Sequence, residues 1–267
     1  MSVRPAPLDE ALAALDRIAP LRLAAAWDNV GLLLEGERSI RRALCTIDLT
    51  TEVGEEALQH DVDLVLAYHP PIFRGLKRLT TRDAIPRTLL ALARHGVHVY
   101  SPHTALDAVD GGVNDWLLEP FGTCTDVAPI EPDPTDLNVG VGRVATLAEP
   151  QSLDAVLTGL KSHLSLQHLR VAGPRAHPVR SVAVCPGAGG SVFETLAKSG
   201  RTVDLLLTGE MRHHDVLACV ARGTSVVLTD HTNTERGYLP RYAAQVASGL
   251  RIEVVVSAVD ADPLVVR

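Results

Sequence analysis

Two segments of the chain place an imidazole and a carboxylate four residues apart. The first is His103-Thr104-Ala105-Leu106-Asp107, and the second, 128 residues later, is His231-Thr232-Asn233-Thr234-Glu235. Side chains with this spacing point in the same direction when the segment is helical. Imidazole nitrogens and carboxylate oxygens bind Zn, Mn, Fe and Co, and the residue types alone do not distinguish among these metals. Each segment therefore predicts half of a metal site.

Other polar side chains follow apolar runs that read as strands. Ligands of open α/β sheets bind outside the carboxyl ends of such strands. Of the residues in these positions, Glu210, His213 and His214, together with His103, are candidates for moving protons. The full set beyond the repeated pairs is Asp48, Tyr68, His69, Glu210, His213 and His214.

The number of ligands bears on the number of ions. Four or more histidine and carboxylate ligands can hold two metals about 3.5–4 Å apart, an arrangement that activates water for hydrolysis. The cysteines are widely separated and form no Cys-x-x-Cys pair, which argues against a thiolate zinc site or a disulfide framework. We therefore predict one or two divalent ions per chain, held by nitrogen and oxygen ligands.

Two stretches are candidates for binding a substrate. The turn containing Gly187, Gly189 and Gly190 lies between a predicted strand and a predicted helix, where backbone amides can hold a phosphate. The alternative is a tight turn with Ser191 as the helix cap. The stretch Trp27-Asp28-Asn29 could line a pocket, with Trp27 stacked on a flat ligand. Equally, Trp27 could lie in the core with Asp28 as a cap. Asp48 is assigned to substrate binding as well.

Strand and helix patterns alternate along the chain, which predicts an α/β fold with a largely parallel sheet. The strand Val62-Asp63-Leu64-Val65-Leu66 is repeated as Val203-Asp204-Leu205-Leu206-Leu207, at an offset of 141 residues. Together with the repeated metal-binding pattern, this indicates an internal duplication. We expect two similar α/β lobes with a metal cleft between them.

The Pro-rich stretch from residue 126 suggests a boundary between these lobes. We predict an N-terminal α/β lobe over residues 1–125, a connecting segment with strand, helix and strand over 126–180, and a C-terminal α/β lobe over 181–267. All three parts are expected to form one compact domain. Helices are predicted over residues 8–18, 85–95 and 153–164 from the spacing of their apolar residues.

Composition excludes several classes of protein. The 267 residues include 46% hydrophobic residues and carry a net charge of −7. No block of Lys and Arg stands out, so we predict no nucleic-acid partner. No apolar run approaches the length of a membrane span, and the N-terminus lacks the layout of a signal peptide. We therefore expect a soluble, cytoplasmic protein with no membrane partner.

Six motifs together are similar to those of one family. Over about residues 8–256 the chain resembles the NGG-interacting-factor-three-like family, also called the GTP cyclohydrolase 1 type 2 family. Many bacterial members have His-His where this chain has Tyr68-His69, so the chain looks like a eukaryotic-type variant, without the domain inserted in many members. The motifs span residues 27–32, 68–74, 101–108, 111–117, 209–215 and 231–237.

The resemblance implies a dinuclear metal centre and a ring-shaped homohexamer. It implies His69, Asp107, His231 and Glu235 as metal ligands, with His103 and Tyr68 as further ligands or neighbouring groups. The missing second histidine leaves open whether one or two ions bind. The function implied is a metal-dependent hydrolase acting on a nucleotide-like or phosphorylated small molecule. The alternative is a non-catalytic metal-binding scaffold, a metal-handling protein or a regulatory interaction protein.

Overall fold

The computed structural model describes residues 4–174 and 178–266. Within it the chain forms two compact units. Unit 1 contains residues up to Leu106 together with Tyr238–Ala261, and unit 2 contains Asp107–Gly237 and the residues from Asp262 onward. The chain passes from one unit to the other within helix α4 (His103–Ala108) and returns within the short 3-10 turn η4 (Arg236–Tyr238).

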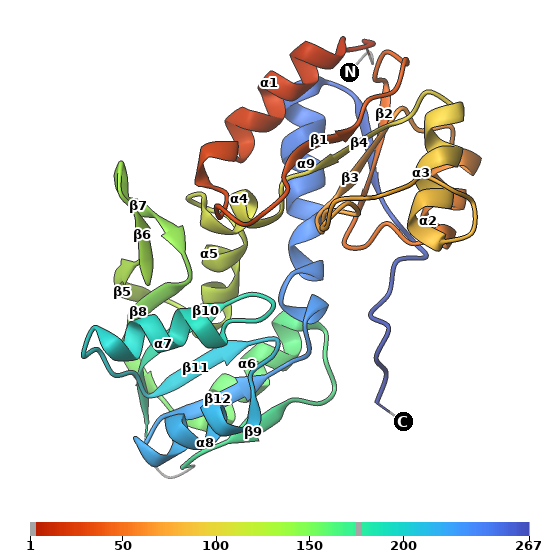
Figure 1. Ribbon diagram of the computed structural model, residues 1–267. Helices are drawn as coiled ribbons and strands as arrows, with labels where there is room; N and C mark the ends of the chain where they lie inside the picture. The colour runs from red at the N-terminus through yellow and green to blue at the C-terminus, as the bar shows by residue number, and fades with distance from the viewer. Residues whose placement is uncertain (1–3, 175–177, 267) are drawn as a thin grey trace. The chain divides into compact units, whose positions relative to one another are not determined.

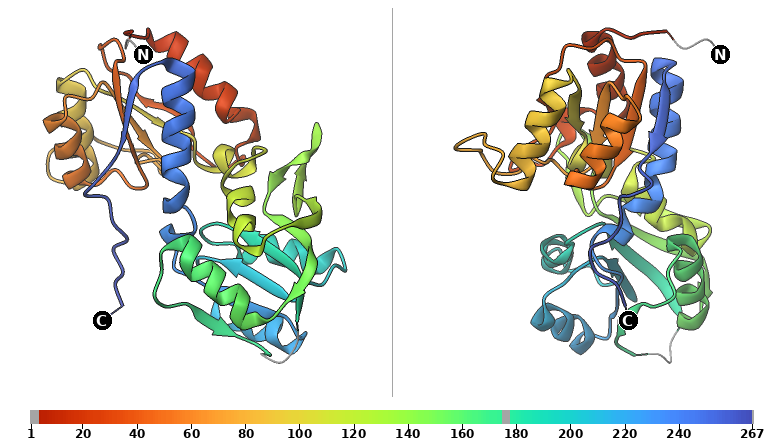
Figure 2. Two further views of the ribbon diagram at one scale, coloured as in Figure 1. Left: turned by 180° about the vertical axis from the view of Figure 1, so that it is seen from behind. Right: turned by 90° about the vertical axis from the view of Figure 1, so that its right-hand side faces the viewer.

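Unit 1 is built on a five-stranded sheet in the order β1-β4-β3-β2-β13. The four strands from β4 to β13 run parallel, and β1 pairs with β4 in the antiparallel sense. Helices α2 and α3 cover one face of the sheet, and α1 and α9 cover the other (Figures 1 and 2). The strands are β1 (Gly31–Leu34), β2 (Arg42–Thr46), β3 (Leu64–Ala67), β4 (His98–Ser101) and β13 (Glu253–Val256), and the helices are α1 (Leu8–Ile18), η1 (Leu21–Leu23), α2 (Thr51–Gln59), α3 (Ala84–Arg94) and α9 (Leu239–Leu250).

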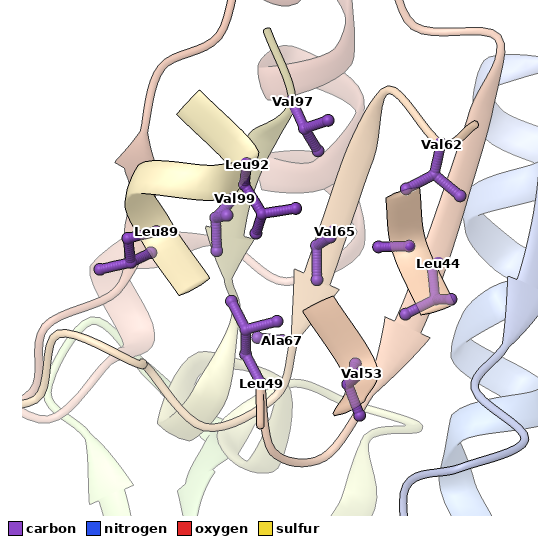
Figure 3. Packing of buried hydrophobic residues seen from close by; sticks show 11 residues of the cluster. Leu44, Leu49, Val53, Val62, Val65, Ala67, Leu89, Leu92, Val97 and Val99 are labelled. Carbon is purple, nitrogen blue, oxygen red and sulfur yellow. The ribbon is translucent and has the colours of Figure 1, made fainter. Parts of the chain in front are cut away.

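One hydrophobic cluster of unit 1 lies between its sheet and the pair α2 and α3. Every residue of β3 is buried, as expected for a parallel strand covered on both faces. Helix α2 begins where the Thr50 side chain accepts a hydrogen bond from the Val53 amide. Each fully buried Leu or Val side chain contributes about 1.5–3 kcal/mol to folding. The residues packed together here include Leu44, Val53, Val65, Leu89, Leu92, Val97 and Val99 (Figure 3).

Unit 2 contains a six-stranded sheet in the order β5-β8-β10-β11-β12-β9 and a separate hairpin of β6 and β7. Helices α7 and α8 cover one face of the six-stranded sheet, and α5 and α6 lie on the other (Figures 1 and 2). Its strands are β5 (Cys124–Ala128), β6 (Glu131–Asp133), β7 (Asp136–Val141), β8 (Arg143–Gln151), β9 (Arg170–Ala172), β10 (Val179–Cys185), β11 (Leu205–Thr208) and β12 (Ser225–Leu228). Its helices are α5 (Val113–Leu118), η2 (Glu119–Phe121), α6 (Leu153–Leu164), α7 (Gly190–Lys198), α8 (His213–Ala221) and η3 (Thr232–Thr234).

The two units repeat one β-α-β-α-β segment, which runs from β2 to β4 in unit 1 and from β10 to β12 in unit 2. An aspartate before the middle strand has the same role in both copies. Asp63 accepts hydrogen bonds from two successive amides at the start of β2, at 2.8 and 3.2 Å. Asp204 accepts from two successive amides at the start of β10, at 2.8 and 2.9 Å. The shared detail supports the predicted duplication, and the α/β fold class is confirmed.

The structure differs from the predicted boundaries. The stretch 126–180 is no connector, because it supplies β5 to β9 and helix α6 to unit 2. The last helix and strand, α9 and β13, belong to unit 1. The expectation of a largely parallel sheet is also wrong for unit 2, where only β10, β11 and β12 are parallel. Local sequence reveals strands but not their pairing partners, which are far away along the chain.

No helix in the described part of the chain combines the length and apolar character needed to cross a membrane. The longest helices, α6 and α9, have 12 residues each.

A buried arginine fixes the start of β8. Arg143 is 2% exposed, and its Nε and Nη2 donate to the two carboxylate oxygens of Asp115 at 2.6 and 3.1 Å. We expect Arg143→Met to lower the free energy of unfolding by about 3 kcal/mol, because Asp115 loses its partner. Asp115 keeps some contact with water, which places the loss at the lower end of the range for buried pairs. Urea unfolding followed by circular dichroism measures the change.

The exposed Arg180 provides a matched control for this substitution. Arg180→Met should change the unfolding free energy by less than about 0.5 kcal/mol, as surface substitutions usually do. Equal effects of the two substitutions would contradict the structural role of Arg143.

Candidate metal centre

His103 begins α4 directly after β4 and is held by a buried carboxylate. Its Nδ1 lies 2.8 Å from Asp28 Oδ1, and the Asp28 side chain is fully buried. Thr104 donates to Asp28 Oδ2 through its hydroxyl at 2.5 Å and its amide at 3.2 Å. Burial would raise the pKa of Asp28, but the hydrogen bonds from His103 and Thr104 outweigh it and lower the pKa. His103 has a φ of +26°, a strained value of the kind found at functional sites.

His69 follows β3 and lies beside His103 in unit 1. Its Nδ1 is 2.9 Å from Asp48 Oδ1, and its ring centre is 5.3 Å from that of His103. The buried ring of Tyr68 packs against both, with centroid distances of 5.1 and 5.5 Å. A carboxylate only accepts hydrogen bonds, so Nδ1 of His69 must carry the proton, and the lone pair of the neutral ring is then on Nε2. Nε2 is therefore the atom suited to bind a metal.

Unit 2 contains the second histidine–carboxylate group. His231 follows β12 and Asp230, which has a φ of +66°. Its Nδ1 lies 3.3 Å from Glu210 Oε2, and its Nε2 lies 3.6 Å from Glu235 Oε1. Glu235 is 3% exposed. A buried carboxylate requires a compensating positive charge, so a His231–Glu235 pair of this geometry could hold a metal ion.

The turn at Gly187 gives these two ligands the space they occupy. Gly187 has a φ of +59°, and a Cβ there would lie 2.9 Å from both Glu235 Oε1 and His231 Nε2. The Gly187 amide donates to Thr234 Oγ1 at 2.8 Å, and that hydroxyl donates to the His231 carbonyl at 2.6 Å. The turn therefore holds the backbone of η3 and leaves no room for a side chain.

The charges of Asp107 and Glu235 both act on the buried Cys185 thiol. Burial, followed by the charges of Asp107, Glu131 and Glu235, raises the pKa of the Cys185 thiol far above its usual range. Asp107 is on α4 one turn after His103, and is the first residue of unit 2. Glu131 was not predicted from the sequence, because it follows no strand of the repeated segment. All four thiols of the chain are free.

One pattern recurs at three histidines. The Nδ1 atoms of His69, His103 and His231 each contact a carboxylate, respectively Asp48, Asp28 and Glu210. Such contacts orient a histidine ring and increase the basicity of its other nitrogen. The sequence assigned Asp28 and Asp48 to substrate binding and Glu210 to proton transfer. In the structure each of them contacts a histidine ring, and the roles assigned from the sequence stay predictions.

Of the three glycines predicted to bind a phosphate, Gly187 and Gly189 have amides that bond within the protein. The Gly189 amide donates to Thr208 Oγ1 at 2.9 Å, and the Gly187 amide is also engaged, as described above. Only Gly190, the first residue of α7, lacks such a bond among the described residues. Because two of the three amides are satisfied internally, the predicted phosphate-binding role of this turn stays a prediction that rests on the Gly190 amide.

The remaining predicted residues fall into two groups. Trp27 is 65% exposed, so it does not lie in the core. Asn29 donates from its side chain to the Ile72 carbonyl at 2.6 Å, which ties the Trp27 loop to the segment after His69. His213 and His214 are exposed, with their rings 5.5 Å apart. Within residues 4–174 and 178–266, neither forms a hydrogen bond or ion pair with Glu210 or His231.

Fold and site together define a class: a duplicated α/β protein whose strand ends carry histidine–carboxylate groups suited to divalent metals. The chain belongs to the Duf34/NIF3 (NGG1p interacting factor 3) family, whose model matches residues 6–263. The resemblance seen in the sequence motifs is thereby confirmed.

Individual relatives are similar over nearly their full length. A protein NIF3 homolog from Schizosaccharomyces pombe is 42% identical over 260 residues, covering 91% of this chain and 92% of that protein. NGG1-interacting factor 3 of Saccharomyces cerevisiae is 34% identical, covering 98% and 97%. The crystal structure of a Bacillus cereus protein related to NIF3 matches with a TM-score of 0.85 over 100% of both chains, at 20% identity. This last match establishes a shared fold.

Proposed function

We propose that the protein is a metal-dependent hydrolase acting on a nucleotide-like or phosphorylated small molecule, with His69, Asp107, His231 and Glu235 as metal ligands. The observation that carries this proposal is the buried Glu235 carboxylate, 3.6 Å from Nε2 of His231. A cytoplasmic location, expected from the sequence, and a ring-shaped homohexamer, which rests on the family resemblance alone, are part of the proposal.

The residues present fit a divalent cation. The carboxylate of Glu235 is almost fully buried, and a cation would compensate its charge. His69 and His231 both have Nδ1 against a carboxylate, so Nε2 is the ligand atom in each neutral ring. Gly187 leaves open the space that a Cβ would fill beside Glu235 and His231. A divalent ion bound there would supply Lewis acidity and activate water.

The chain's own residues supply orientation and proton transfer. Asp48 and Glu210 hold the rings of His69 and His231 in one tautomer. His103 has Nδ1 engaged by Asp28, so its Nε2 is the atom that would exchange a proton with the substrate. The fully buried Asp28 keeps that ring fixed, because its other oxygen is bound by Thr104.

Turnover tests this function directly. Protein loaded with Zn²⁺, Mn²⁺ or Co²⁺ is incubated with GTP and a panel of phosphoesters, and ring-opened or dephosphorylated products are measured. We expect Asp107→Ala to reduce turnover by more than about 100-fold, because loss of a ligand exceeds the cost of losing a group that merely supports one. Asp110→Ala removes an exposed carboxylate three residues away and should leave turnover unchanged.

The possible outcomes separate two functions. Turnover that survives in Asp107→Ala would belong to a contaminant and would contradict the proposal. No turnover on the whole panel, with metal fully bound, would favour a metal-binding scaffold or regulatory interaction protein. The name of the Saccharomyces cerevisiae relative, NGG1-interacting factor 3, makes that second function worth testing.

A further inference from the structure

Unit 1 exposes large apolar side chains in two segments that contact each other. Trp27 is 65% exposed and Phe73 is 53% exposed. Their rings meet edge to face with a centroid distance of 6.0 Å. Leu76 and Leu79, in the same loop as Phe73, are 39% and 57% exposed. Single exposed apolar side chains are ordinary, but a contiguous group of them often marks a binding site.

The loop between β3 and α3 also concentrates positive charge, in a short cluster that does not stand out as a block of Lys and Arg in the whole sequence. Residues 74–82 contain four cations, Arg74, Lys77, Arg78 and Arg82, and no acid, although the whole chain has a net charge of −7. All four are exposed. None forms an ion pair with any carboxylate in the described ranges 4–174 and 178–266. The cations alternate with the exposed apolar residues, so the same loop offers stacking and charge.

This loop is linked to the histidines of unit 1. It begins five residues after His69. Asn29 ties the segment just before it to the Trp27 loop by a 2.6 Å hydrogen bond to the Ile72 carbonyl. The Trp27 ring lies 6.0 Å from the His103 ring, edge to face. A series of aromatic rings therefore leads from the exposed Trp27–Phe73 pair to His103 and His69.

We propose that the Trp27–Phe73 pair and the cations of loop 74–82 bind a nucleotide, with the base on the aromatic pair and the phosphates on the loop. Arg binds phosphate oxygens through paired N–H donors, and Lys binds them through a compact positive charge. An exposed Trp can stack on any of the nucleic-acid bases. The inference rests on the proposed function, because it assigns the residues that would bind the nucleotide proposed there as substrate. Loop 74–82 thereby takes the place of the Gly187–Gly190 turn as the proposed phosphate-binding element, because two amides of that turn are already engaged.

Binding to the metal-free, full-length protein tests the inference separately from turnover. In EDTA, titration calorimetry is performed with three probes: GTP, guanosine and tripolyphosphate. GTP should bind more tightly than either fragment and should quench the fluorescence of the exposed Trp27. The second tryptophan, Trp116, is 5% exposed and should not respond. Raising the salt concentration should weaken GTP binding more than guanosine binding.

Variants assign the two halves of the ligand. The triple variant Arg74→Gln, Lys77→Gln, Arg78→Gln should raise the Kd for GTP by about 30-fold, roughly threefold per cation, and leave guanosine unchanged. Trp27→Ala should weaken guanosine and GTP but not tripolyphosphate. Arg94→Gln, which neutralises an exposed cation at the end of α3, is the matched control and should change nothing.

Several results would overturn the inference. These are no GTP binding at millimolar concentration, equal losses in the triple variant and in Arg94→Gln, or tighter binding of a single-stranded oligonucleotide through the same loop. The last result would assign the loop to nucleic acid instead. If GTP binds as expected but no metal is bound at Glu235, the inference stands and the proposed hydrolase function fails. All substitutions lie on exposed residues, and unchanged thermal unfolding confirms that each variant is folded.

Discussion

Glu235→Gln is expected to weaken divalent metal binding by more than about 100-fold while the protein remains folded. Removing a group that only supports a metal ligand costs about 10–100-fold in affinity, and Glu235 is proposed as a ligand itself. The substitution preserves the volume of the side chain but removes the charge that lies 3.6 Å from His231 Nε2. Titration calorimetry with Zn²⁺ measures the affinity, and elemental analysis measures the number of ions per chain.

Two further variants show whether the loss of metal affinity in Glu235→Gln is that of a ligand. Glu210→Gln should weaken the metal by about 10–100-fold, because Glu210 orients His231 and does not bind the ion. Glu194→Gln, an exposed glutamate on α7, should have no effect. The proposed centre would be ruled out if the wild-type chain held well below one transition metal after loading, or if Glu235→Gln bound metal as tightly as Glu194→Gln.

Gly187→Ala should also abolish tight metal binding, although the substitution replaces none of the proposed metal ligands. The added Cβ would lie 2.9 Å from both Glu235 Oε1 and His231 Nε2, which is closer than real Cβ contacts allow. Either the two ligand atoms move or the turn shifts, and we expect a loss of about 100-fold in affinity, comparable to losing a group that supports a ligand. Overpacking and the positive φ should also lower the free energy of unfolding by about 1–3 kcal/mol.

Gly200→Ala separates the two causes. Gly200 has a φ of +79°, but nothing lies within 4 Å of a Cβ built there. Its substitution therefore carries the backbone cost of about 1–2 kcal/mol without the collision, and metal affinity should be retained. If both alanine variants bound metal equally well, the space at Gly187 would have no role in the site.

The sequence by itself determined the local elements and the ligand types. Apolar spacing predicted helices over 8–18 and 153–164, and these are the observed bounds of α1 and α6, because one helical face must bury its apolar residues. The repeated His-Thr-x-x-acid pattern identified His231 and Glu235, which do meet in the structure. Predicting that His231 and Glu235 meet needed no long-range information, because both side chains project from one short turn that follows β12.

Only the tertiary structure decided which residues support the ligands and where the chain divides. Asp28 and His103 are 75 residues apart in sequence, and a hydrogen bond at 2.8 Å joins them because folding brings their loops together. The sequence cannot distinguish the engaged amides of Gly187 and Gly189 from amides open to a phosphate. Their partners are distant in the chain: Thr234 on η3 for Gly187 and Thr208 on β11 for Gly189. Likewise, α9 and β13 join unit 1 because β13 pairs in parallel with β2, a choice made by strand pairing and burial rather than by local composition.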